Sequence, residues 1–182
     1  MKLFKKLMAV ALAGAMALAV LTGCAATLDK RELIAYLNDT NSGVTFTDAG
    51  AKQAEALISM IKAAYDKAED KAAFDPVEAL FGEDSEEEYD EEKLAAARSA
   101  VGVKEDDPDH CEVRIGKMKE LKGQMNKEYA DVTLFESAES IELAEGRGLY
   151  SDHGTISISY VTLGDAEYFV AVVCGGNRGR RI

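Results

Sequence analysis

The last third of the chain contains the pattern that most constrains the fold. Two runs rich in β-branched and aromatic residues, Thr155–Leu163 and Ala166–Cys174, flank Gly164 and Asp165. A two-residue Gly-Asp link between such runs predicts a β-hairpin. The second run is apolar at consecutive positions, so we expect a central strand covered on both faces. Alternation would place Tyr168, Val170, Val172 and Cys174 on one face and Phe169, Ala171 and Val173 on the other.

The first half of the chain shows helical spacing instead. Apolar positions predict a short helix over 29–37 and a longer one over 48–68, with Thr47 as its N-cap. Asp75 followed by Pro76 predicts the start of a short helix that Gly82 ends. Asp90 is placed to cap a further helix over 91–100, after an acidic run that we expect to be a solvated loop.

The segment 111–127 fits both the alternation of a strand and the spacing of a helix. Cys111, Val113 and Ile115 alternate as in a strand, and Gly116 and Gly123 weaken a continuous helix. We therefore expect a strand followed by a helix over 117–127. Together these elements predict an α+β fold in which a helical N-terminal half packs against an antiparallel sheet from the C-terminal half.

The N-terminus carries a different signal. Lys2, Lys5 and Lys6 precede an uncharged apolar run over 7–20, which is too short for a comfortable membrane span. Leu21-Thr22-Gly23-Cys24 follows and resembles the lipobox of bacterial lipoprotein signal peptides. The resemblance implies cleavage before Cys24, diacylation of its thiol and a lipid-anchored location on the extracytoplasmic face of the cell membrane. We then expect a signal peptide over 1–23, a tether over 24–30, a single domain over 31–176 and a basic flexible tail over 177–182.

The negative net charge of the chain bears on which kinds of molecule it can bind. The net charge is −12 over the whole chain, and the signal peptide holds three lysines and no acid, so the mature protein would be near −15. Nucleic-acid binding depends on Lys and Arg that displace counterions from phosphates. We therefore expect no nucleic-acid partner and interpret the acidity as solubilising.

Two cysteines remain once Cys24 is assigned to lipid. Cys111 and Cys174 form an even pair in a protein expected to be exported, where disulfides are permitted. They are either a disulfide or two separate buried thiols, because spacing alone does not show whether they meet.

Candidate catalytic and metal-binding residues are few. His110 lies near Asp107 and Asp109, and His153 follows Asp152. The two groups could form a metal site only if their loops met, and neither has a recognised ligand spacing. His110 could not activate the Cys111 thiol directly, since neighbours in a strand point to opposite faces, so His153 would have to act as the base. We assign no catalytic residue, no metal and no cofactor.

A second resemblance covers about half of the mature chain. The segment 31–38 as a first helix, Phe46-Thr47 opening a second, and a terminal hairpin are similar in order to the cysteine-rich secretory and pathogenesis-related (CAP) superfamily. Neither helix carries a histidine, and the Gly-Glu-Asn and His-Arg segments are absent. The resemblance therefore implies at most a degenerate CAP-like domain, and no site residues are transferred.

These observations favour a membrane-anchored binding or structural module of the cell envelope, with an envelope protein or a small molecule as partner. The alternative is an extracytoplasmic hydrolase. A cleft that held His110, Cys111 and His153 together would favour the enzyme.

Overall fold

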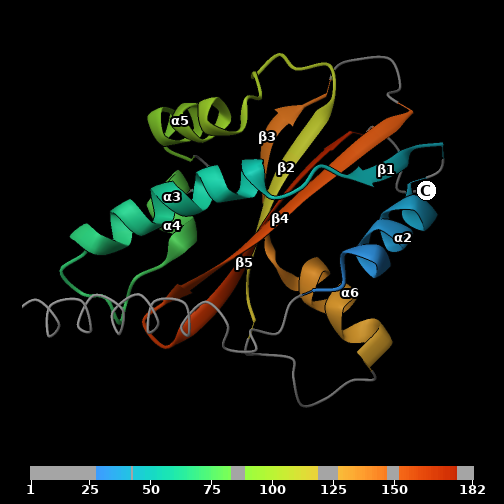
Figure 1. Cartoon of the computed structure of the whole chain (residues 1–182). Helices are drawn as coiled ribbons and strands as arrows, with labels where there is room; N and C mark the ends of the chain where they lie inside the picture. Colours follow the sequence, from blue (N-terminus) through green and yellow to red (C-terminus); the bar gives the residue numbers. More distant parts are fainter. Residues whose placement is uncertain (1–27, 42, 83–88, 119–126, 147–151, 176–182) are drawn as a thin grey trace, which may run out of the picture.

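The computed structural model describes residues 28–41, 43–82, 89–118, 127–146 and 152–175. A five-stranded sheet forms the middle layer, with helices on both of its faces (Figure 1). The order along the sheet is β1-β4-β5-β2-β3. The helices are α2 (Lys30–Thr40), α3 (Lys52–Lys67), α4 (Pro76–Phe81), α5 (Glu91–Val101) and α6 (Lys127–Ser137), and the strands are β1 (Thr45–Asp48), β2 (His110–Lys117), β3 (Glu139–Glu145), β4 (His153–Leu163) and β5 (Ala166–Gly175).

The predicted α+β class is confirmed: most of the helices come from the N-terminal half, and four of the five strands come from the C-terminal half. The sheet is mixed, however, because β1 pairs with β4 in parallel while the other three pairings are antiparallel. The four strands of the C-terminal half pair antiparallel with one another, as predicted, and the parallel pairing comes from β1 of the N-terminal half. Helix α6 also comes from the C-terminal half.

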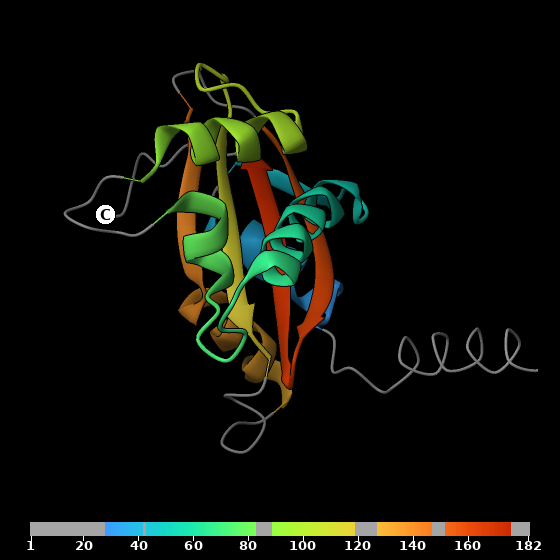
Figure 2. The ribbon, with the colours of Figure 1, turned by 90° about the vertical axis from the view of Figure 1, so that its left-hand side faces the viewer.

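Strand β5 is the centre of the molecule, as its apolar sequence predicted. It lies between β4 and β2, and Phe169 to Val173 are all buried. Its alternating side chains enter two separate apolar clusters, because successive residues of a strand point to opposite faces. We call the two sides of the sheet face A, which is covered by α3, α4 and α5, and face B, which is covered by α2 and α6 (Figure 2).

Helix α3 begins later than the sequence predicted. Thr47 is not its N-cap but part of β1, and the helix starts at Lys52. The β-forming residues of β1 find a partner in β4, where the Phe46 ring lies over Gly154. The cap is supplied from the sheet instead, since the Ala54 N–H donates to Ser157 Oγ on β4 at 3.2 Å.

The caps of helices α4 and α5 were predicted correctly. Asp75 accepts hydrogen bonds at the start of α4, Gly82 ends that helix with a φ of 87°, and Asp90 caps α5. By contrast, the helix expected over 117–127 does not begin at Lys117, which is the last residue of β2. Pairing with β5 extends this strand, and Gly116 permits it because a Cβ there would overlap the Phe169 ring. Residues 119–126 lie outside the described part of the chain.

Candidate functional site

A group of polar side chains in contact with one another lies on face B of β2. His110, Glu112 and Arg114 occupy alternate positions of the strand and are half-buried, whereas the residues between them are buried on face A. The period of a strand places all three on one side. Ser140 of the neighbouring strand β3 joins them, and we call these four residues the β2 polar network.

Arg114 connects this network to α6. Its Nε donates to Glu112 Oε1 at 2.6 Å, and its Nη1 donates to the carbonyl oxygen of Phe135 at 3.2 Å. The guanidinium carbon also lies 4.7 Å from the centre of the Phe135 ring. Phe135 lies in the last turn of α6, where carbonyl groups lack a partner within the helix. Arg114 therefore satisfies one of these groups and stacks as a cation on the aromatic ring.

Glu112 is the anionic centre of the network. Its Oε2 accepts from Ser140 Oγ at 2.9 Å and lies 3.8 Å from His110 Nε2. Burial raises the pKa of Glu112, but the neighbouring His110 ring, the charge and hydrogen bond of Arg114, and the Ser140 hydroxyl outweigh burial and lower it to about 2. Glu112 is therefore ionised at every physiological pH.

His110 is held tightly at the start of β2. Its side chain is only 12% exposed, and its Nδ1 is the one buried side-chain nitrogen or oxygen without a hydrogen-bond partner among the described residues. Gly146 approaches its backbone so closely that a Cβ there would overlap the His110 nitrogen. The φ of +67° at Gly146 also favours glycine.

The second histidine does not join this network. His153 begins β4, on the other side of β5 from β2, so two strand spacings of about 10 Å in total separate the two histidines. Its side chain is 80% exposed and contacts Asp152, with His153 Nε2 lying 3.5 Å from Asp152 Oδ1. Alternation along the strands places His153 on face A and His110 on face B. Within the described ranges, no three His, Cys, Asp or Glu side chains are grouped so that they could hold a metal ion.

Cys111 points to face A and is joined to Cys174 by a disulfide. The two residues lie directly opposite each other on β2 and β5, which settles the choice between a disulfide and two separate thiols. A disulfide sulfur carries no thiol proton, so Cys111 has no free nucleophile in this state. His110, Cys111 and His153 therefore do not form the shared cleft that would favour an enzyme.

Other sequence predictions fall outside this site or outside the described residues. Cys24 and the basic tail over 177–182 are not among the residues that the structure describes, and neither is most of the acidic run over 83–92. Of the segments that carry the CAP-like resemblance, 31–38 lies in α2 and the terminal hairpin is present, but Phe46 and Thr47 form a strand and open no helix.

The network itself was missed by the sequence prediction, which associated His110 with the aspartates before it and with Cys111. The signal that could have found it is the alternation of His110, Glu112 and Arg114 along a strand whose intervening residues are apolar. Ser140 could not be added, because its position opposite Arg114 depends on the register of β3.

Comparison of the chain with protein-family models, with curated proteins and with solved structures finds no match to any of them. Within the described residues, no helix combines the length and the apolar character needed to cross a membrane.

Proposed function

We propose that this protein is a lipid-anchored module on the extracytoplasmic face of the cell membrane, attached through Cys24, and that it acts by binding or by a structural role. The observation that carries the proposal is the sequence Leu21-Thr22-Gly23-Cys24 behind a basic and then apolar N-terminus. Two acyl chains anchor a protein stably, whereas one gives only marginal binding.

The disulfide supports export. Cys111 and Cys174 are bonded within the apolar cluster of face A, and disulfides persist in oxidising compartments outside the cytoplasm. A protein whose central strand is cross-linked to its neighbour suits the environment that the lipobox implies.

The β2 polar network favours binding or structure over catalysis. The carboxylate of Glu112 is held by Arg114 and Ser140, and the Arg114 guanidinium is also engaged with the end of α6. These bonds fix a helix to the sheet, and the Ser140 hydroxyl is directed to a carboxylate instead of to a histidine that could activate it. The network therefore lacks the nucleophile and base pairing of a hydrolase.

The lipid anchor is tested by metabolic labelling with a palmitate analogue. We expect the wild-type protein to carry label and to sediment with membranes, and we expect Cys24→Ala to lose both. The matched control is the double variant Cys111→Ala with Cys174→Ala, which removes cysteines and leaves Cys24 in place. Label retained on Cys24→Ala would refute the assignment.

The binding role is tested by comparing partners of the anchored and released forms. Affinity capture from native membranes with the acylated protein should recover an envelope protein or a small molecule that the released Cys24→Ala form recovers less well. A hydrolytic activity that His110→Ala abolishes would instead favour the enzyme.

A further inference from the structure

The first described residues of the chain are fixed firmly to the domain. Leu28 is 3% exposed and packs in the apolar cluster of face B. Its N–H donates to Tyr160 Oη on β4 at 3.0 Å, and the Asp29 N–H donates to Asp131 Oδ2 on α6 at 2.8 Å. Burial raises the pKa of Tyr160 to about 12, although the bond from Leu28 acts in the opposite direction, so the hydroxyl stays neutral beside the backbone.

This arrangement makes the covalent tether shorter than the sequence predicted. The expected tether ran to residue 30, but Lys30 already belongs to α2 and Asp29 is its N-cap. Only the three residues 25–27 separate Cys24 from Leu28. An extended chain advances at most about 3.5 Å per residue, so the two Cα atoms are at most about 14 Å apart.

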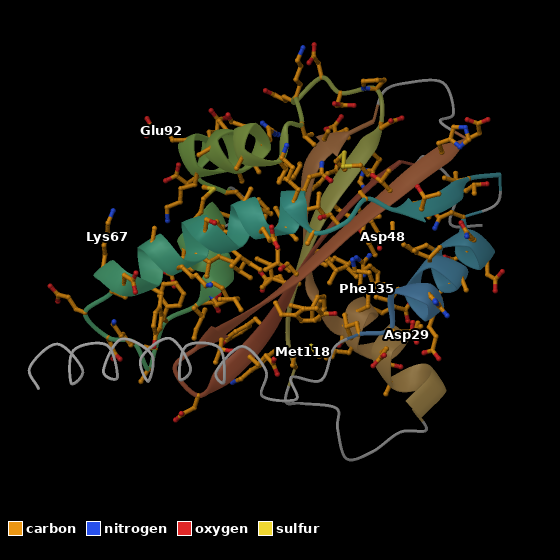
Figure 3. All side chains as sticks on the ribbon, in the orientation of Figure 1. Asp29, Asp48, Lys67, Glu92, Met118 and Phe135 are labelled. Carbon is orange, nitrogen blue, oxygen red and sulfur yellow. A yellow bond between two sulfur atoms is a disulfide. The ribbon has the colours of Figure 1, made fainter. Side chains whose placement is uncertain are left out.

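The domain is much wider than this reach. A folded chain of the mature length has a radius of gyration of about 15 Å, which corresponds to a diameter of roughly 40 Å. The attachment point lies on one side of the molecule, where α2 starts beside α6. Figure 3 shows Asp29 at this point, with Glu92 of α5 on the far side of the sheet.

We propose that the surface around α6 and the start of α2 faces the lipid bilayer and that α5 faces away from it. This orientation rests on the proposed acylation of Cys24. A tether of about 14 Å attached beside α6 does not allow a domain of roughly 40 Å to turn α5 toward the headgroups. Partners of the anchored protein would then meet α5 and the loop that follows it.

The tether, and not charge attraction, imposes this orientation. Asp131 and Glu136 lie on α6, and the mature chain has a net charge near −15, so an anionic bilayer repels the domain. Docking through charge weakens as salt rises, whereas a covalent tether does not. The orientation should therefore persist at high ionic strength.

The test compares two matched cysteine substitutions, Ala130→Cys on α6 and Ala96→Cys on α5, in full-length acylated protein. Ala130 is partly exposed and Ala96 is exposed. The disulfide occupies Cys111 and Cys174, and acylation blocks the thiol of Cys24, so a fluorophore reacts only at the introduced cysteine. The proteins are reconstituted into phosphatidylcholine vesicles that contain a headgroup-quencher lipid.

We expect quenching severalfold stronger at Ala130→Cys than at Ala96→Cys, with a ratio unchanged between low and high salt. Inserting 20 Gly/Ser residues after Thr27 gives a tether with a mean span of about 25 Å, so the ratio should fall toward one. Ser137→Cys on α6 and Ser99→Cys on α5, both exposed, form a second matched pair if the first does not fold.

Equal quenching at the two positions with the native tether, or stronger quenching on α5, would overturn the orientation. Failure of the anchor itself has a different signature. The protein would then stay in solution, and Cys24 would react with the fluorophore in the absence of any introduced cysteine.

Discussion

Replacing Phe169 by alanine tests the placement of the core most directly. Phe169 is fully buried at the centre of β5 on face B. Its ring stacks on Phe135 of α6 with the centroids 6.4 Å apart, and it covers Gly116 of β2. The alanine variant would therefore leave a cavity between the sheet and α6, beside the Phe135 ring and Gly116.

Truncation of a buried phenylalanine in this way costs about 3–5 kcal/mol, through lost transfer free energy and the cavity that remains. A typical domain has about 5–15 kcal/mol of stability, so the variant should still fold. With a urea slope of about 2 kcal/mol per molar, the midpoint of unfolding should fall by about 2 M.

The matched control is Phe74→Ala. Phe74 is partly exposed and packs edge-on against Tyr65 at 5.1 Å, outside the sheet. We expect a cost of about 1 kcal/mol there, because less apolar area leaves water on folding. Urea denaturation of both variants is followed by circular dichroism with the disulfide intact. A midpoint that moves equally in the two variants, or hardly at all for Phe169→Ala, would show that the core lies elsewhere.

Two further predictions follow from the described contacts. The double variant Cys111→Ala with Cys174→Ala should lose about 4 kcal/mol in urea denaturation, from the entropy of closing a loop of 63 residues; an unchanged midpoint would contradict this. Glu112 has a folded pKa of about 2 against 4.5 in its ordinary state, so its stabilisation of about 3 kcal/mol is present above pH 4.5 and is lost as the pH falls toward 2. As the pH is lowered, the free energy of unfolding of Glu112→Gln should therefore fall less steeply than that of the wild-type protein. Parallel curves of stability against pH for the two proteins would refute this role.

The parts of the fold that the sequence predicted correctly depend on local rules. Asp75 before Pro76, Asp90 before an acidic first turn, and Gly164-Asp165 between two β-forming runs each specify a cap or a turn without any distant contact. The strand β5 was also predictable, because a run that is apolar at every position must be covered on both faces.

The errors lie where a distant partner decides the structure. Thr47 is an acceptable N-cap in isolation, but pairing with β4 places it in β1. Lys117 could begin a helix, but β5 holds it in β2 opposite Tyr168. In both cases the hydrogen bonds of a neighbouring strand outweigh a weak helical preference, and those bonds connect residues more than 50 positions apart.

The β2 polar network likewise combines a feature that the local sequence sets with contacts that depend on distant segments. His110, Glu112 and Arg114 share a face because a strand alternates, which the sequence alone implies once the strand is accepted. What makes the group stable comes from elsewhere: Ser140 through the register of β3, and the Phe135 ring and carbonyl through the docking of α6. Burial alone would have raised the pKa of Glu112, and it is lowered to about 2 by His110 and Arg114 of the same strand and by Ser140 of β3. Replacing Arg114 by alanine removes one of these neighbours, so the pKa of Glu112 should rise toward its ordinary value.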